Sequence, residues 1–392
     1  MSEQKYNITV MGVSCFDGMA SSMRVRNLLE PLVAKNLVSV NNLIYQKDNK
    51  EPIGKEGVLN GITFKVIGFS LKNVFSVFGF VFGGFSFIRK SKKKGYKNII
   101  YNYNYPDIKN IWFILYARMV GYKVIFDVIE DNNYQAHVGF INKFRIKTSL
   151  FLFKYCRHFA DAMIGISEHL YKLNRTTTED KIPSYLIPVT VNLKYFKNEA
   201  AVPVKKENIK IFYGGSFGEK DGLEYLIDAF DEVSRVHDNV ELIFTGIGHQ
   251  QDMDKIFARI EKVKNRNRII YKGFLATDEY YRVLNECDIF CMTRINSKFA
   301  NAGFPFKLGE FLASGKAVIA TNVGDVPNYL FNDINALLVN PNSAEEIIDA
   351  LLLLIEDPDK RKALGTEARK TAERCFDSDT VGMRLLTIFE AA

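Results

Sequence analysis

Short runs of β-branched and aromatic residues alternate with longer stretches of helical periodicity along almost the whole sequence. This alternation is typical of parallel sheets whose strands are joined by crossover helices, and it predicts an α/β protein. In the first half we expect strands at 7–11, 63–67, 98–101, 123–127 and 162–166, with helices at 22–35, 107–120 and 142–158. In the second half we expect strands at 210–213, 241–245, 269–272, 289–292, 317–320 and 336–339, with helices at 223–235, 250–262, 307–313 and 344–356.

The alternation is interrupted once, near the middle of the chain. Residues 200–207 contain a proline, small residues and charges without an apolar period, so we interpret them as a linker. A chain of 392 residues is also too long for one ordinary core. The sequence therefore predicts two doubly wound, Rossmann-like domains, residues 1–200 and 201–376. In such domains ligands bind at the carboxyl ends of the strands.

Two chemistries that are common in this fold class lack their fingerprints here. The loop after the first predicted strand runs from Gly12 to Gly18, and the equivalent loop of the second half runs from Gly214 to Gly218. Neither has the GxGxxG spacing of a dinucleotide-binding loop, and the sequence contains no GxxxxGK[ST] segment. Nicotinamide-dependent and P-loop functions are therefore disfavoured.

Composition narrows the partners and the location. The net charge of +7 is modest for this length and does not favour a nucleic-acid partner. The five cysteines are scattered without CxxC spacing, and no HxH, DxD or clustered-carboxylate pattern indicates a metal site. The polar N-terminus leads directly into a strand and lacks the sections of a secretory signal. We expect a cytoplasmic protein without a cofactor or a metal.

A glycine-rich loop with a lysine follows the first strand of the second half. In residues 213–222 (YGGSFGEKDG) a strand ends in glycines, and a helix comes next. Glycines let backbone amides approach an anion closely, and a helix N-terminus adds a positive dipole. Lys220 would add a full charge on a phosphate. Taken alone, the segment fits equally well an ordinary strand-to-helix turn with a solvated lysine.

A second candidate segment spans residues 301–316 (NAGFPFKLGEFLASGK). Its Lys307 and Glu310 are three residues apart and face the same side of a predicted short helix. A cation and a carboxylate in this arrangement suit a pyrophosphate joined to a ribose diol, although an exposed ion pair has the same pattern. The ligand-contacting candidates of this segment are Gly303, Phe304, Lys307, Leu308 and Glu310.

The C-terminal half resembles glycosyltransferase family 4, a large group of retaining enzymes with the GT-B fold. The stretches that carry the resemblance are 211–226 (IFYGGSFGEKDGLEYL), 242–248 (LIFTGIG), 287–294 (CDIFCMTR) and 304–326 (FPFKLGEFLASGKAVIATNVGDV). Residues 160–170 (ADAMIGISEHL) and 187–196 (IPVTVNLKYF) resemble the segment before the family's linker. The resemblance implies two Rossmann-like domains facing a central cleft, with a C-terminal helix near 377–392 packed back on the first domain.

The resemblance also implies a nucleotide-sugar donor, a UDP- or GDP-sugar, bound by the second domain. It implies metal-independent transfer with retention, in which the leaving phosphate deprotonates the acceptor, and a role in cell-surface polysaccharide or glycoconjugate assembly. Gly214, Gly215 and Ser216 match the family's phosphate-facing loop, and Lys220 matches its phosphate-binding lysine. Glu310 matches the second glutamate of the E-x7-E motif, which holds the ribose. Thr245 and Gly246 match a loop beside the base.

The sequence departs from the family pattern at three places. One is Lys307, which stands where a subset of these enzymes with an FPxKLxE pattern also carries lysine. The first glutamate of the E-x7-E motif falls at Ala302, and Phe217 stands near the position of the usual arginine. Arg294 is our candidate for the second positive charge. Ala302 leaves another hypothesis open, a catalytically silent GT-B subunit that binds nucleotide or glycan and supports a partner. The presence of Lys220 and Glu310 favours an enzyme.

The first domain is expected to hold the acceptor, a glycan or a lipid-linked molecule. Residues 12–26 (GVSCFDGMASSMRVR) resemble the family's first glycine-bearing loop, with candidates Gly12, Gly18, Ser21 and Arg24. Asp127 and Glu130 follow a predicted strand, so we expect their carboxylates at the acceptor side as catalytic candidates, beside Lys220 and Glu310 on the donor side. Many relatives have a histidine in this region, and the nearest one here is His137.

Residues 73–97 combine an aromatic stretch with a basic one. Phenylalanines at 75, 78, 80, 82, 85 and 87 precede cations at 89, 90, 92, 93, 94 and 97. The apolar run is short for a membrane span. Two interpretations remain open: a helix that packs its phenylalanines into the core, or a surface that binds an anionic membrane. The second would place the protein peripherally at the inner face of the plasma membrane.

Overall fold

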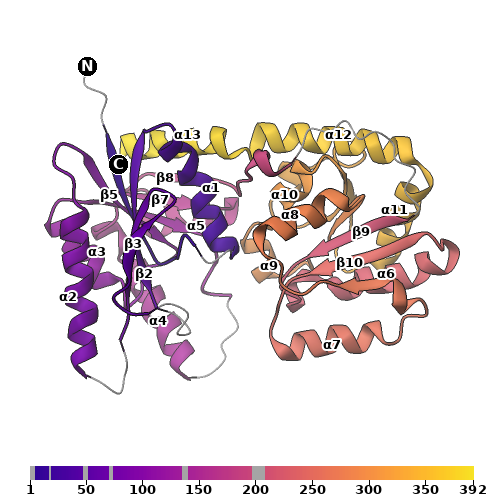
Figure 1. The fold of residues 1–392 in the computed structure, drawn as a ribbon, viewed down its shortest axis with the longest axis horizontal. Coiled ribbons are helices and arrows are strands. Elements are labelled where there is room, and N and C mark those ends of the chain that lie inside the picture. The colour runs from indigo at the N-terminus through magenta and orange to yellow at the C-terminus, as the bar shows by residue number, and fades with distance from the viewer. Residues whose placement is uncertain (1–4, 17–18, 47–51, 70–73, 135–139, 197–207) are drawn as a thin grey trace. The chain divides into compact units, whose positions relative to one another are not determined.

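The computed structural model divides the chain into two compact units (Figure 1). Unit 1 comprises Met1–Pro188 and Ser378–Ala392, and unit 2 comprises Val189–Asp377. The structure describes residues 5–16, 19–46, 52–69, 74–134, 140–196 and 208–392. Each unit is built on one sheet with crossover helices, which confirms the predicted α/β class with two doubly wound domains.

The sheet of unit 1 has eight strands within the described residues, in the order β3-β4-β2-β1-β5-β6-β7-β8. Neighbouring strands are parallel except β3 and β4, which form an antiparallel pair. Every residue of β1 is buried, as expected for a parallel sheet that is covered on both faces. The strands are β1 (Tyr6–Met11), β2 (Val38–Tyr45), β3 (Glu56–Leu59), β4 (Ile62–Ile67), β5 (Lys97–Tyr103), β6 (Lys123–Val128), β7 (Ala162–Gly165) and β8 (Ser184–Leu186).

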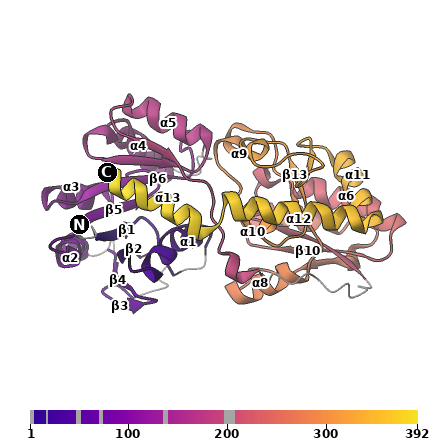
Figure 2. The same ribbon diagram turned by 90° about the horizontal axis from the view of Figure 1, so that it is seen from above.

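Helices cover both faces of this sheet. Crossover connections between parallel strands are right-handed, so the direction in which the chain moves along the sheet decides which face a helix covers. The chain moves from β1 to β2 through α1, and in the opposite direction, toward β8, through α2, α3, α4 and α5. Helix α1 therefore lies on one face and the other four helices lie on the opposite face. The last helix, α13, packs on α1, while α2 packs on α3 and α4 on α5 (Figure 2). No helix in the described parts of the chain is long and apolar enough to cross a membrane. The helices are α1 (Ala20–Ala34), α2 (Val74–Ser91), α3 (Ile111–Met119), α4 (Phe140–Lys154), α5 (Glu168–Thr178) and α13 (Ser378–Ala391).

Unit 2 contains a parallel sheet in the order β11-β10-β9-β12-β13-β14. Its strands are β9 (Ile209–Gly214), β10 (Val240–Thr245), β11 (Ile269–Tyr271), β12 (Ile289–Met292), β13 (Ala317–Thr321) and β14 (Leu337–Val339). Its helices are α6 (Leu223–Val236), α7 (Gln250–Ile260), α8 (Thr277–Glu286), α9 (Lys298–Ala302), α10 (Leu308–Ala313), α11 (Ala344–Glu356) and α12 (Pro358–Cys375).

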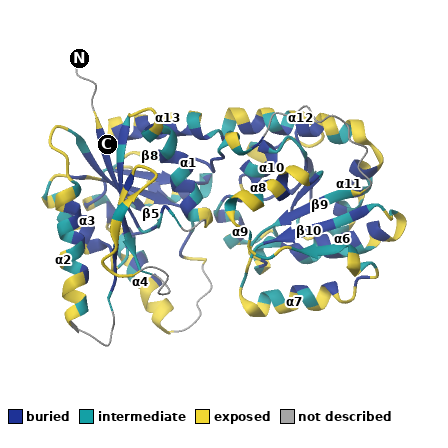
Figure 3. Ribbon diagram, viewed as in Figure 1, coloured by how far each residue is buried: buried dark blue, intermediate teal, exposed yellow. Residues whose placement is uncertain are grey.

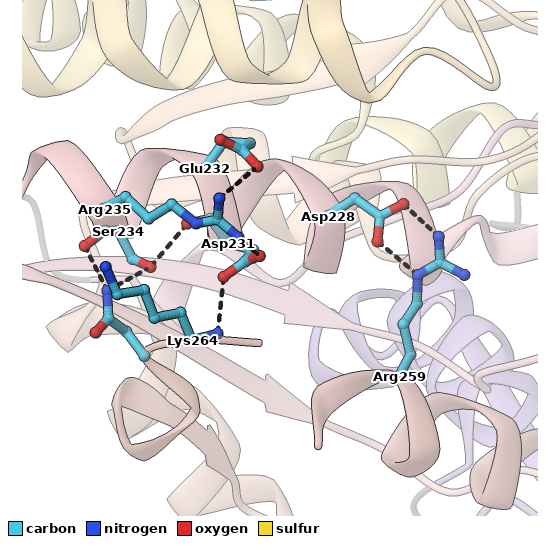
Figure 4. A network of polar contacts seen from close by, with 8 residues as sticks. Asp228, Asp231, Glu232, Ser234, Arg235, Arg259 and Lys264 are labelled. Atoms are coloured by element: carbon cyan, nitrogen blue, oxygen red, sulfur yellow. Dashed lines mark hydrogen bonds and ion pairs between the residues drawn. The ribbon is translucent and has the colours of Figure 1, made fainter. Parts of the chain in front are cut away.

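Charged side chains connect α6 to α7 and to the segment after it (Figure 4). Arg259 of α7 forms a two-point ion pair with Asp228 of α6. Asp231 of α6 accepts from the backbone N–H of Lys264 at 2.9 Å and from Arg235 at 2.6 Å. Exposed pairs of this kind contribute at most about 1 kcal/mol each. They therefore orient α7, while the buried apolar cluster beneath α6 stabilises the unit.

The boundary between the units lies at residues 188/189, whereas the sequence pattern places it at 200/201. Val191 explains the difference, because its backbone N–H donates to the Phe376 carbonyl at 2.8 Å and so joins this segment to unit 2. The predicted linker, residues 200–207, lies outside the described residues. Every predicted strand and helix overlaps an observed element, while β2, β3 and β8 are strands that the pattern does not predict.

Candidate functional site

The strand order of the unit 2 sheet has a topological switch point between β9 and β12. The chain adds β10 and β11 on one side of β9, and β12, β13 and β14 on the other. In open parallel sheets the ligand site lies at the carboxyl ends of the two strands that flank such a switch point. Gly214, Gly215 and Ser216 end β9 or follow it, and Arg294 follows β12. Candidates from two separate segments therefore meet at this edge.

Backbone crowding explains the glycines at this edge. A Cβ atom on Gly246, whose φ is +133°, would lie 1.8 Å from the Gly215 carbonyl oxygen. A Cβ atom on Gly248 would lie 2.1 Å from the Ser216 carbonyl oxygen. The loops after β9 and β10 are thus in backbone contact, which only glycine permits. Thr245 fixes its loop by donating its hydroxyl to a carbonyl of the loop after β11 at 2.7 Å.

Two tyrosines of α8 hold the carboxylate that is predicted to bind the ribose. The Tyr280 hydroxyl donates to Glu310 Oε2 at 2.8 Å, and the Tyr281 hydroxyl donates to Oε1 at 3.1 Å. The Lys307 ammonium lies 4.3 Å from the centre of the Tyr280 ring and donates to its hydroxyl at 3.2 Å. Burial, reinforced by the Glu310 carboxylate, raises the pKa of the Tyr280 phenol well above its usual value, so this phenol stays protonated and able to donate.

Lys307 connects this network to the glycine-rich loop. A Cβ atom on Gly214 would lie 3.2 Å from Lys307 Cδ, so the lysine stem passes directly beside the end of β9. Burial lowers the pKa of the Lys307 ammonium, and the carboxylates of Glu310 and Asp221 oppose that shift. Asp221 also accepts from the Ser216 hydroxyl at 2.5 Å. A desolvated cation beside a glycine loop at a switch point is an arrangement suited to a phosphate.

The two other predicted phosphate-binding cations contact α9 and the loop after it. The Lys220 ammonium lies 4.6 Å from the centre of the Phe299 ring. The Arg294 guanidinium donates to the carbonyls of Ala300 at 2.9 Å and Gly303 at 3.4 Å. Arg294 therefore braces the loop that precedes α10. Lys220 makes a cation–π contact of about 0.5–1 kcal/mol, which is weak enough to be exchanged for a phosphate.

Several candidate positions lie in the interior of unit 2. The Phe304 ring is 2% exposed and packs on two other aromatic rings, and Leu308 is fully buried. Their side chains support the turn into α10, so only their backbone is available to a donor. Ala302 is buried as well. Phe217, at φ +58°, packs on aromatic core residues, so no charge replaces the family's usual arginine at that position.

Unit 1 has its own switch point, between β1 and β5. Gly12 follows β1 with φ +83°, and a Cβ atom there would lie 2.7 Å from the Tyr103 carbonyl oxygen at the end of β5. The Asn42 side chain of β2 hydrogen-bonds to two backbone groups of the loop after Gly12, each at 2.9 Å. Ser21 lies in the first turn of α1, whereas Gly18 lies outside the described residues. The predicted acceptor-side loop therefore stands at this switch point.

Arg24 and Asp127 lie in the core of unit 1 and not at the surface where the sequence pattern places them. Their side chains are fully buried and form a two-point ion pair, with Nε–Oδ2 at 2.7 Å and Nη2–Oδ1 at 2.8 Å. The Tyr101 hydroxyl donates to Asp127 at 2.6 Å, and Arg24 also donates to the carbonyls of Ile187 and Pro188. Burial opposes the charge on Arg24, but Asp127 outweighs it and raises the guanidinium pKa. This pair connects structural elements and is not exposed to a substrate.

A histidine–aspartate pair near the ends of β6 and β7 is not among the sequence candidates. Asp131 Oδ2 lies 2.8 Å from His169 Nε2, and the aspartate is buried while 38% of the histidine side chain is exposed. A carboxylate behind an imidazole fixes the orientation of the ring. Glu130 is half-buried next to this aspartate, and His137 lies outside the described residues. In the described part of the chain, no group of three or more His, Cys, Asp or Glu side chains could hold a metal ion.

The sequence of the chain is similar to those of known glycosyltransferases. Residues 195–371 match the family model of glycosyl transferases group 1. An uncharacterized glycosyltransferase of Methanocaldococcus jannaschii is 27% identical over 325 residues, which cover 74% of this chain and 84% of that protein. The N,N'-diacetylbacillosaminyl-diphospho-undecaprenol α-1,3-N-acetylgalactosaminyltransferase of Campylobacter jejuni is 22% identical over 251 residues, which cover 61% of this chain and 62% of that enzyme.

The similarity to solved structures with this fold extends over almost the whole chain. Sucrose-phosphate synthase from Thermosynechococcus elongatus has a TM-score of 0.74 at 18% identity and covers 98% of both chains. Anabaena HepE, solved in complex with UDP and glucose, has a TM-score of 0.72 at 15% identity and covers 99% of this chain and 100% of its own. At these identities the likeness concerns the fold, and the expected GT-B architecture is confirmed.

Proposed function

We propose that the chain is a glycosyltransferase with the GT-B fold that moves a sugar, with retention of configuration, from a UDP- or GDP-sugar to a glycan or lipid-linked acceptor. The observation that carries this proposal is the network of Tyr280, Lys307 and Glu310 beside the glycine loop after β9. It offers a carboxylate for ribose hydroxyls, a cation for a diphosphate and backbone amides for phosphate oxygens. The HepE structure, which contains UDP, supports a nucleotide donor.

In the proposed reaction the bond between the anomeric carbon and the diphosphate breaks while the acceptor oxygen attacks the same face. The acceptor proton passes to an oxygen of the leaving phosphate, so the reaction needs no protein nucleophile. Lys220, Lys307 and the amides of Gly214–Ser216 stabilise the negative charge that develops on the diphosphate. Glu310 holds the donor by accepting hydrogen bonds from the ribose hydroxyls.

We place this reaction in the assembly of a cell-surface polysaccharide or glycoconjugate, at the cytoplasmic side of the plasma membrane. The C. jejuni relative is named for a diphospho-undecaprenol acceptor, which supports a lipid-linked acceptor here. Exposed aromatic side chains of α2, such as Phe78 and Phe82, support a peripheral association with an anionic membrane.

Release of nucleoside diphosphate without an acceptor tests this proposal against a catalytically silent subunit, which Ala302 would favour. Thermal shifts with UDP, GDP, ADP and CMP first identify the nucleotide. We then expect slow hydrolysis of the matching nucleotide sugars, because a competent site transfers some sugar to water. Stabilisation by a nucleotide without hydrolysis of any matching sugar would support the silent subunit. NMR of the transfer product checks the stereochemistry, and an inverted anomer would contradict retention.

Transfer is expected to continue in excess EDTA. We assign the charge of the leaving diphosphate to Lys220, Lys307 and backbone amides, which a chelator leaves unchanged. The measurement compares initial rates of nucleoside diphosphate release in EDTA, magnesium and manganese. Complete loss of turnover in EDTA that either metal restores would show that a divalent ion neutralises the diphosphate instead.

A further inference from the structure

The aromatic stretch of α2 is divided between core and surface. Phe80 and Phe87 are each 6% exposed, whereas Phe78 and Phe82 are 56% and 64% exposed and stack on each other at 6.4 Å. Both interpretations of this stretch therefore apply, each to a different side of the helix. Both residues lie in the N-terminal half of α2. Figure 3 shows exposed stretches along this helix.

The basic residues that follow α2 lie far from this exposed pair. Because α2 rises about 1.5 Å per residue, Lys92 is about 20 Å farther along the helix axis than Phe78. Since α2 connects β4 to β5, it begins at the carboxyl edge of the sheet and ends at the amino edge. Lys92 is also engaged there, donating to the Val120 carbonyl. Residues 73–97 are therefore not one compact aromatic and basic patch.

Helix α4 has both exposed aromatic and exposed basic side chains within its first two turns. Phe140, Ile141 and Phe144 are 84%, 80% and 54% exposed, and Lys143, Arg145 and Lys147 between and after them are exposed too. The whole helix, like α2 and α3, contains no Asp or Glu. Cations among exposed aromatic residues are typical of a helix that lies at a membrane interface.

Topology brings the first turns of α2 and α4 to the same edge of unit 1. Each helix follows a strand of the parallel part of the sheet, β4 or β6, so both begin at its carboxyl edge (Figure 1). Gly12 and the His169–Asp131 pair also follow strands at that edge. We call the exposed residues Phe78, Phe82, Phe140, Ile141 and Phe144 the aromatic rim.

We propose that the aromatic rim inserts into the surface of an anionic phospholipid bilayer, with Lys143, Arg145 and Lys147 on the lipid phosphates. This docking turns the carboxyl edge of the unit 1 sheet toward the bilayer, so the acceptor is lipid-linked and reaches its site from the membrane. Lys92, Lys93 and Lys94, at the other edge, do not take part. The choice of acceptor rests on the proposed transferase function, whereas the docking itself does not.

Two matched charge reversals in the full-length chain test this proposal. The probe is co-sedimentation with phosphatidylcholine vesicles with and without phosphatidylglycerol, at low and at high salt. We expect the parent protein to bind only the anionic vesicles, and less at high salt because the field is screened. Lys143→Glu, Arg145→Glu and Lys147→Glu together should weaken binding about 100-fold or more, since each surface cation contributes about fivefold. The same change at Lys92, Lys93 and Lys94 should alter binding much less.

Aromatic substitutions and two controls complete the test. Phe78→Ser with Phe82→Ser, and Phe140→Ser with Phe144→Ser, should each reduce vesicle binding without lowering the melting temperature, because these rings are exposed. Donor hydrolysis should stay at the parent rate in all variants, which separates a failure of docking from a failure of the transferase function. Absence of parent binding to anionic vesicles, or release by the 92–94 reversal and not by the 143–147 reversal, would overturn the proposal.

Discussion

Replacing Glu310 with Gln is expected to lower the transfer rate about 30- to 1000-fold while leaving the fold intact. The change removes a charge that two tyrosines hold in place, and an amide has one acceptor oxygen where the carboxylate has two. Loss of one such contact in a desolvated site costs about 2–4 kcal/mol at the transition state. Lys220→Ala should have an effect of similar size, because it removes a positive charge that stabilises the leaving diphosphate.

Tyr280→Phe distinguishes a positioned carboxylate from a merely charged one. The ring stays beneath Lys307, but the hydroxyl that donates to Glu310 and accepts from the lysine is lost. A neutral hydrogen bond contributes about 0.5–1.5 kcal/mol, so we expect a loss of about tenfold or less, mainly in KM. Glu279→Gln, an exposed change on the same helix, serves as the control. Near-normal turnover of both Glu310→Gln and Lys220→Ala, with any identified donor, would contradict the assigned donor site.

Hydrophobic periodicity was sufficient to locate most elements of the fold. Predicted and observed bounds coincide for α11 and β12, because their apolar patterns are strong and their neighbours are polar. The periodicity did not predict strand β2, because Asn41 and Asn42 lie in its middle and asparagine is uncommon in strands. Both are buried and hydrogen-bonded, Asn41 to Asn7 and Asn42 to backbone carbonyls. Such compensation by other strands is invisible to local sequence patterns.

The same limit applies to the candidate site. Gly214, Lys307 and Glu310 belong to short segments whose chemistry is local, so the sequence alone could suggest them as candidates. Tyr280 meets Glu310 across 30 residues, and the His169–Asp131 pair spans 38. No local signal marks either contact, because tyrosines and histidines at the start of a helix are common and their partners depend on the packing of the sheet.

Asp127 illustrates the reverse case, in which a local rule suggests an exposed side chain and packing buries it. A carboxylate at the end of a parallel strand often faces a ligand, and this rule made Asp127 a catalytic candidate. Its partner Arg24 lies 103 residues away in α1, and the pair is fully buried. The sequence shows both residues but not their contact.

Replacing Arg24 with Met is expected to destabilise unit 1 by about 3–5 kcal/mol, because it leaves the Asp127 charge buried without its cation. The carbonyls of Ile187 and Pro188 would lose their donors as well. Arg26→Met, which breaks a partly exposed pair with Glu30 on the same helix, is the matched control and should cost at most about 1 kcal/mol.

Denaturant melts of the parent and both variants measure these differences. Asp127→Leu combined with Arg24→Met should recover part of the lost stability, because removing both charges abolishes the uncompensated one. If the Arg24–Asp127 pair is purely structural, the Arg24→Met protein should lose transfer activity only in proportion to its unfolded fraction. If Arg24→Met kept the parent's stability and lost transfer, the pair would instead belong to the acceptor side, as its position in the sequence first suggests.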